Sequence, residues 1–129
     1  MKCLITDDQP VFMKKMVESF DYDIEIGVAK DGQEGLNEFF RAHKNNDPFD
    51  VLFLDLEMPI IRGEEMLIAI RCYEDTMGLD NIKVIVTSAN TSANKAMELF
   101  KGGCDFYLRK PIDKGELNKA ITFVYKGES

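Results

Sequence analysis

The stretch Val51-Leu52-Phe53-Leu54-Asp55 decides the fold, because four consecutive apolar residues run directly into a carboxylate. An apolar run without alternation is typical of a strand covered on both faces, as in a parallel sheet. Four further strand-sized runs, rich in β-branched or aromatic residues, occur at 3–5, 24–29, 84–86 and 106–108. The sequence therefore predicts five strands.

The segments between these runs carry apolar residues at helical spacing. The sets are Met13, Met16, Val17 and Phe20; Leu36, Phe39 and Phe40; Gly63, Met66, Leu67 and Ile70; Ala93, Ala96, Met97 and Phe100; and Leu117, Ala120, Ile121 and Val124. We interpret every set as the core-facing stripe of a helix. His43, at the end of the second set, is interpreted as a helix-surface residue, and Thr76-Met77-Gly78 as loop.

Strict alternation of strands and helices predicts an α/β fold with a parallel sheet covered by helices on both faces. Ile24, Ile26 and Val28 alternate with other residues, which suits an edge strand. A second strand at the edge favours a flavodoxin-like (βα)5 doubly wound sheet of strand order 2-1-3-4-5 over a classical Rossmann order. The length predicts one domain over residues 1–129, with no output domain in this chain.

Composition excludes several classes of function. The net charge of −7 argues against non-specific nucleic-acid binding, which needs a basic face. Three cysteines without CxxC spacing favour reduced thiols in the cytoplasm, and no apolar run is long enough to span a membrane. His43 is the only histidine, so a zinc site and a Ser-His-Asp triad are both disfavoured.

Polar residues follow four of the five predicted strands, where parallel sheets form their sites. They are Asp7-Asp8, Asp55, Thr87-Ser88 and Arg109-Lys110. The proposed strand order makes these four strands neighbours, so the side chains are expected to converge on one edge. Each alone has a plainer interpretation, such as a helix cap for the aspartates and Ser88 or a solvated surface lysine for Lys110. Together they predict a site.

The charges at this edge predict the chemistry. With Glu57 included, four carboxylates face the single ammonium of Lys110, and such repulsion raises pKa values or attracts a cation. Oxygen ligands without histidine or thiolate favour a hard cation, Mg²⁺ above all. A carboxylate nucleophile at Asp55, a metal ion, the Lys110 ammonium and the Ser88 hydroxyl suffice to form an aspartyl phosphate.

The whole chain resembles the receiver domain of two-component response regulators, the CheY-like family. The resemblance rests on five features: Asp7-Asp8, Leu54-Asp55-Leu56-Glu57-Met58-Pro59, Gly63, Thr87-Ser88-Ala89 and Lys110-Pro111. Any one of these motifs is weak. All of them in this order and at these intervals form a specific pattern.

The resemblance implies a role for each motif residue. Asp55 would be the phosphoacceptor, Asp8 would bind Mg²⁺ directly, Asp7 would bind it largely through water, and Glu57 would contribute its backbone carbonyl. Ser88 would donate to the phosphoryl group and Lys110 would pair with it. The Lys110-Pro111 peptide bond would be cis, an isomer that costs little before proline.

The resemblance also implies a switch and its partners. On phosphorylation the Ser88 hydroxyl would move toward the phosphate and Tyr107 would turn inward, reshaping a face made by the fourth helix, fifth strand and fifth helix. The phosphoryl donor would be a sensor histidine kinase or a histidine phosphotransfer protein, and the downstream target an unidentified protein. The chain would promote its own phosphorylation and dephosphorylation as a signalling switch, as a monomer or as a phosphorylation-dependent dimer.

Three alternatives stay open at the level of sequence. A haloacid-dehalogenase-type phosphatase also uses a strand-end aspartate, but its usual second aspartate is Glu57 here. A flavodoxin-like FMN binder would need a Ser/Thr/Gly-rich loop where this chain has Asp7-Asp8-Gln9-Pro10. A pseudo-receiver would bind partners without phosphorylation. Glu57 and Asn90 occupy variable positions of the family, where Glu57 either binds Mg²⁺ or hinders the hydrolytic water.

Overall fold

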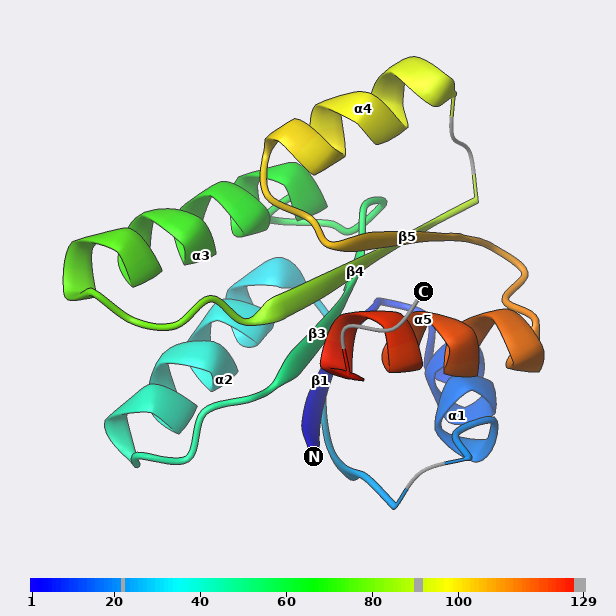
Figure 1. Cartoon of the computed structure of the whole chain (residues 1–129), viewed down its shortest axis with the longest axis horizontal. Helices are drawn as coiled ribbons and strands as arrows, with labels where there is room; N and C mark the ends of the chain where they lie inside the picture. The colour runs from blue at the N-terminus through cyan, green and yellow to red at the C-terminus, as the bar shows by residue number, and fades with distance from the viewer. Residues whose placement is uncertain (22, 90–91, 127–129) are drawn as a thin grey trace.

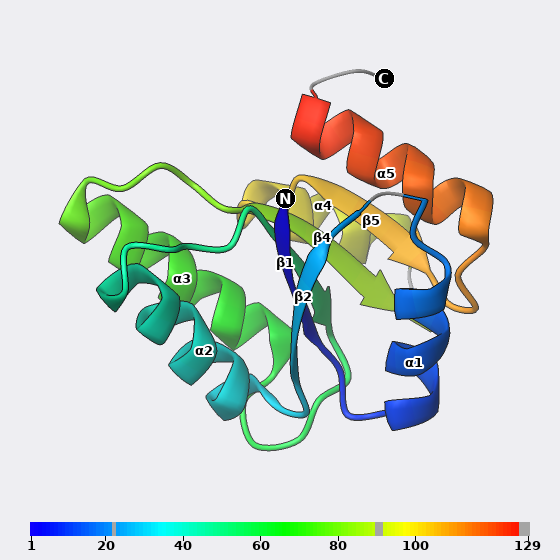
Figure 2. The ribbon, with the colours of Figure 1, turned by 90° about the horizontal axis from the view of Figure 1, so that it is seen from below.

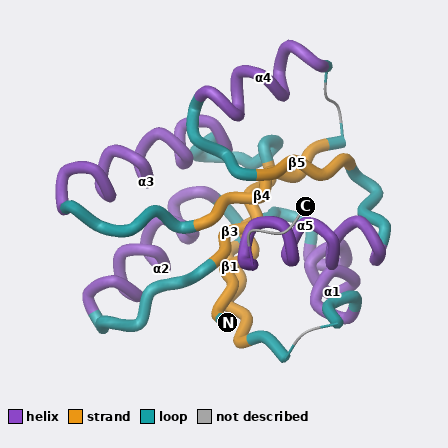
Figure 3. The backbone as a smooth tube through the Cα atoms, in the orientation of Figure 1, coloured by secondary structure: helices purple, strands orange, loops and turns teal. Residues whose placement is uncertain are grey.

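The computed structural model describes residues 1–21, 23–89 and 92–126 and consists of five alternating strands and helices (Figure 3). The strands are β1 (Lys2–Thr6), β2 (Glu25–Ala29), β3 (Val51–Asp55), β4 (Lys83–Ser88) and β5 (Phe106–Arg109). The helices are α1 (Pro10–Glu18), α2 (Gly32–Lys44), α3 (Gly63–Met77), α4 (Ala93–Lys101) and α5 (Lys114–Lys126). Each predicted strand run overlaps one of these strands.

The five strands form one sheet in the order β2-β1-β3-β4-β5, with every neighbouring pair parallel (Figure 1). This confirms the predicted flavodoxin-like order, with β2 at one edge. The register pairs Leu4 with Leu52 and Leu52 with Val84, so the apolar runs of the three central strands lie side by side. Their carboxyl ends consequently meet at the same edge of the sheet.

Side chains of the central strands alternate between two apolar layers, as the period of a strand requires. Leu52 and Leu54 of β3 pack with α2, α3 and Leu99 of α4, whereas Val51 and Phe53 pack with α1 and α5. Figure 2 shows α2 and α3 on one side of the sheet and α1 and α5 on the other. Both faces of the sheet are therefore covered, which explains the uninterrupted apolar runs.

The helix stripes agree with the prediction in α3 and α5 and only in part in α1 and α2, where Val17 and Phe40 are exposed. In α4 they disagree. Met97 and Phe100 are 58% and 48% exposed, and Leu99 is the buried residue of that helix. The prediction of a Met97–Phe100 core face was therefore wrong: the helix is rotated, so that one leucine faces the sheet and the larger side chains face outward. A nine-residue helix offers too few turns for its apolar spacing to identify the packed face.

Two smaller predictions also need correction. Thr76 and Met77 are helical, because α3 continues to Met77 and ends at Gly78, which adopts the left-handed conformation that favours glycine at a helix end. His43 is half-buried rather than on the helix surface, since its ring lies against the rings of Phe39 and Tyr73, with centroids 4.9 and 5.9 Å away. No helix in the described ranges has the length and apolarity to cross a bilayer.

A charged network lies at the amino-terminal ends of β4 and β5, opposite the carboxyl ends that carry the polar motifs. The Arg71 guanidinium donates to the Gly103 carbonyl, the Ile82 carbonyl and the Glu74 carboxylate, the last at 2.7 Å, and lies 3.2 Å from Asp105. Glu74, 1% exposed, also accepts from the Ile82 amide. The network joins α3 to the segments that enter β4 and β5, and so fixes the amino-terminal ends of both strands.

Candidate functional site

The polar residues that follow β1, β3, β4 and β5 lie together, as the strand order predicts. Asp55 and Ser88 are the last residues of β3 and β4, and Lys110 directly follows β5. The Lys110 amide donates to the Ser88 carbonyl at 2.8 Å, which continues the pairing of β4 with β5 past the end of the strand. Backbone hydrogen bonding of the sheet thus holds the site residues in place.

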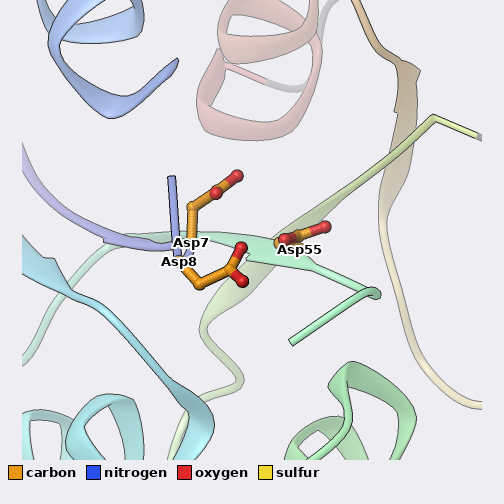
Figure 4. A group of neighbouring side chains, drawn as sticks. All are labelled: Asp7, Asp8 and Asp55. Carbon is orange, nitrogen blue, oxygen red and sulfur yellow. The ribbon is translucent and has the colours of Figure 1, made fainter. Parts of the chain in front are cut away.

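Three carboxylates form the centre of the site (Figure 4). One oxygen from each of Asp7, Asp8 and Asp55 lies within 4.8 Å of the others. Asp7 and Asp55 are buried and Asp8 is exposed, so the group is open to solvent on one side. Figure 4 shows the Asp8 carboxylate directed toward Asp55. An all-oxygen donor set of this kind fits a hard divalent cation such as Mg²⁺.

Lys110 reaches into this group from the β5 side. Its Nζ lies 2.9 Å from Oδ2 of Asp7 and 3.3 Å from Oδ1 of Asp55, and it sits 4.3 Å from the centre of the Phe12 ring. Burial works to lower the pKa of Lys110, but the hydrogen bond to Asp7 and the charges of both carboxylates raise it above its usual range. Lys110 is therefore a fixed positive charge. The Lys110–Pro111 bond is cis, the isomer that the resemblance implied.

Asp55 is the most perturbed carboxylate of the site. It is 1% exposed, and burial, the neighbouring Glu57 carboxylate and the charge of Asp7 raise its pKa to about 7, against the opposing charge of Lys110. The Glu57 amide donates to Oδ1 of Asp55 at 3.1 Å and favours the ionised form. Near neutral pH, binding of a cation or a proton at Asp55 is therefore favourable, because it offsets the cost of a buried negative charge.

Ser88 and Glu57 are joined directly. The Ser88 hydroxyl donates to Oε1 of Glu57 at 2.5 Å, although the two residues are 31 positions apart in the chain. Burial would raise the pKa of Glu57, but the Ser88 hydroxyl, Asp55, its own backbone amide and Lys110 lower it below its usual range. Sequence reasoning placed Glu57 near the metal ligands, yet gave no signal that its carboxylate would contact Ser88.

Tyr107 lies on β5 beside this pair. Its ring packs against the core layer of α2, α3 and α4, and its hydroxyl is shielded from solvent. Burial raises the pKa of this hydroxyl above its usual range, the neighbouring Ser88 hydroxyl works to lower it, and the charge of Glu57 raises it further. The Tyr107 hydroxyl thus lies in the interior, near Ser88 and Glu57.

The loop between β3 and α3 approaches Asp55 closely, and Gly63 makes this possible. A Cβ atom at Gly63 would lie 2.7 Å from the Asp55 carbonyl oxygen and 2.8 Å from the Leu56 Cα, both backbone atoms. Only glycine fits there without moving β3 or α3. The glycine of the motif therefore has a structural role in placing α3 against the end of β3.

A cleft of about 830 Å³ opens next to Asp55, between α1 and the loop from β5 to α5. Its apolar wall includes Phe12, Met16 and Ile112, and Val11 at its rim is 81% exposed. Asp55, Glu57 and Lys110 also line it, so it leads directly to the carboxylates. Sequence reasoning missed the contribution of Phe12, and Asn90 lies outside the described residues.

Comparison with known proteins agrees with this geometry. Residues 3–122 match the response regulator receiver domain. The receiver domain of the Francisella response regulator 1452 superimposes with a TM-score of 0.81 at 31% identity, covering 98% of this chain and 97% of that one. The Vibrio cholerae chemotaxis protein CheY4 superimposes with a TM-score of 0.79 at 27% identity, over 95% of this chain and 97% of that one.

Among curated proteins, hybrid signal transduction histidine kinase L of Dictyostelium discoideum is 26% identical over 123 residues, which cover 93% of this chain and 7% of the kinase. The chain thus spans a small part of the length of that relative. The family match, the similar solved structures and the strand order all indicate the same class. This chain belongs to the response regulator receiver domain family of two-component signalling.

Proposed function

We propose that the chain is a phosphorylation switch in which Asp55 accepts a phosphoryl group from a phosphohistidine. The observation that supports this most is the convergence of the Asp7, Asp8 and Asp55 carboxylates, with the Lys110 ammonium 3.3 Å from Asp55. Asp55 is the member of the group that also lines the open cleft. It is therefore the carboxylate best placed to meet a donor.

Asp7, Asp8 and Asp55, with the backbone carbonyl of Glu57, are the proposed ligands of Mg²⁺. When bound, Mg²⁺ supplies positive charge that offsets the repulsion between these carboxylates and an incoming phosphoryl group. Lys110 adds a second, permanent positive charge on the side of Asp7. Both charges favour the ionised form of Asp55, which is the form that can attack phosphorus.

In the proposed transfer, an oxygen of the Asp55 carboxylate attacks the phosphorus atom of the donor. The new O–P bond forms as the P–N bond breaks, and its electron pair returns to the imidazole nitrogen. Lys110 and the Ser88 hydroxyl then hold two of the phosphoryl oxygens, by charge and by hydrogen bond. Hydrolysis of the same bond by water would reset the switch.

The proposed donor is a sensor histidine kinase or a histidine phosphotransfer protein, in line with the kinase relative. The chain's only histidine, His43, packs in an aromatic cluster of α2 and α3, so the donor is another molecule. The proposed output is a protein contact at the face of α4, β5 and α5, where Met97 and Phe100 are exposed. The free thiols of Cys3, Cys72 and Cys104 are consistent with a cytoplasmic site of action.

Intact-mass measurement after incubation with acetyl phosphate tests this proposal. Wild-type protein is expected to gain one phosphoryl group in the presence of Mg²⁺ and none in EDTA. Asp55→Asn should gain none under either condition, whereas Asp21→Asn, a change at an exposed aspartate, should behave like the wild type. An unmodified, folded wild type that also fails to bind beryllofluoride would instead favour a pseudo-receiver that binds partners without phosphorylation.

A further inference from the structure

The Ser88 hydroxyl, which the proposed function assigns to a phosphoryl oxygen, donates to the Glu57 carboxylate. Ser88 is completely buried at the end of β4, and its hydroxyl donates to the Glu57 carboxylate at 2.5 Å. Glu57 also touches Asp55 from the other side, since its amide donates to Oδ1 of Asp55 at 3.1 Å. Glu57 therefore contacts both groups, Asp55 through its backbone amide and Ser88 through its carboxylate.

A carboxylate and a phosphoryl group present the same feature to a serine hydroxyl, namely an anionic oxygen acceptor. Hydrogen bonds to such an acceptor are roughly twice as strong as those to a neutral one. While the Ser88 hydroxyl donates to Glu57, the Tyr107 hydroxyl is shielded from solvent, so the ring is in an inward position. Ser88 and Tyr107 are thus arranged as the receiver resemblance implies for the phosphorylated protein.

We propose that Glu57 is a positioning residue that stands in for the phosphoryl group in the unmodified protein. It accepts the Ser88 hydrogen bond, keeps Tyr107 inward and must release Ser88 before a phosphoryl oxygen can take the same bond. This inference rests on the proposed function, because it gives Ser88 and Tyr107 the roles of a receiver switch. Phosphorylation would then exchange one anionic acceptor for another rather than move Tyr107 from outside to inside.

Fluorine NMR of protein labelled with 3-fluorotyrosine reports on this arrangement directly. The full chain contains four tyrosines, and Tyr107→Phe identifies the resonance of interest. In EDTA, Glu57→Ala is expected to shift the Tyr107 resonance and to increase its sensitivity to exchange of H₂O for D₂O, because the ring gains access to solvent. Ser88→Ala should cause a similar shift, and the double variant should add little to either single change.

Glu57→Gln is the matched control, because its amide oxygen still accepts a hydrogen bond from Ser88. Its Tyr107 resonance should lie between those of the wild type and Glu57→Ala, because a neutral acceptor binds the Ser88 hydroxyl more weakly than an anionic one. An unchanged resonance in Glu57→Ala, or a larger shift in Glu57→Gln than in Glu57→Ala, would overturn the proposal. Glu57 is an exposed loop residue, so both substitutions at this position are expected to fold.

Chemical rescue separates this proposal from the proposed function. Beryllofluoride with Mg²⁺ should return the Tyr107 resonance of Glu57→Ala toward the wild-type position, because the phosphoryl analogue supplies the acceptor that the substitution removed. If beryllofluoride binds the variant, as shown by its own fluorine resonance, but the tyrosine does not return, the stand-in role of Glu57 is wrong. If neither wild type nor variant binds it, the proposed function fails, while the comparison in EDTA still decides whether Glu57 controls Tyr107.

Discussion

In metal-free protein at pH 8, Asp55→Asn is expected to be more stable to unfolding than the wild type, by up to about 4 kcal/mol. The pKa of Asp55 is raised to about 7, from an ordinary value of 3.8. The folded chain therefore holds a proton on Asp55 at pH values where the unfolded chain has lost it. Wild-type stability is therefore lost as the pH rises from about 4 to about 7, where the folded chain at last ionises the buried carboxyl, and it levels off above that pH.

Urea unfolding in EDTA at several pH values measures this effect. The advantage of Asp55→Asn should be largest at pH 8, shrink as the pH falls through 6 and vanish near pH 4. Addition of Mg²⁺ at pH 8 should stabilise the wild type more than the variant, because the cation offsets the charge of Asp55. Asp21→Asn, at a side chain that is 60% exposed, should follow the wild type. An Asp55→Asn variant that is less stable than the wild type at pH 8 would contradict the assigned electrostatics.

Arg71→Ala is expected to destabilise the chain by about 3–5 kcal/mol, the usual cost of breaking a buried ion pair by removing one partner. The side chain of Glu74 is completely inaccessible to solvent, and its 2.7 Å bond to Arg71 would be lost. The carbonyl of Gly103, which accepts two hydrogen bonds from the same guanidinium, would also lose both. The substitution therefore leaves a buried charge and a carbonyl without their partner.

Equilibrium urea unfolding again provides the measurement, with Arg41→Ala as the control. Arg41 makes a 2.6 Å ion pair with Glu38 one turn away on α2, but its side chain is 64% exposed. An exposed pair of this kind contributes about 0–1 kcal/mol. Arg71→Lys should fall between the two, since it keeps the charge but not the planar fork of donors. Equal effects of Arg71→Ala and Arg41→Ala would show that the network is not a stabilising feature of the sheet.

The strand order and the residues at the carboxyl ends of the strands could be predicted from the sequence. Both depend on the order of strands and helices along the chain and on the spacing of apolar residues within each of them. Uninterrupted apolar runs such as 51–54 identify covered strands, and alternation in 24–29 identifies the edge strand. Once the order of the parallel strands is known, the residues that follow neighbouring strands must lie together at the carboxyl end of the sheet. Asp7, Asp55, Ser88 and Lys110 meet for that reason alone.

Side-chain contacts between distant segments were not predictable in the same way. Glu57 and Ser88 are 31 positions apart, and nothing in either motif says that one side chain bonds the other. The sequence contains one signal of the Arg71 network. Glu74 continues the core-facing helical spacing of Leu67 and Ile70, and a carboxylate on a buried helix face needs a buried partner. The α4 prediction failed because short helices permit several faces, and packing against the sheet selects among them.

The central claim is that Asp55, among all the carboxylates of this edge, carries the phosphoryl group. Borohydride trapping tests it most directly, because borohydride reduces an acyl phosphate to an alcohol and converts phosphoaspartate into homoserine. After incubation with acetyl phosphate and Mg²⁺, peptide mapping of the trapped wild-type protein should find homoserine at position 55, with Asp7 and Asp8 unchanged. Reduction at Asp7, Asp8 or Glu57 in place of Asp55, or a phosphorylated protein that yields no reduced carboxylate, would contradict the account.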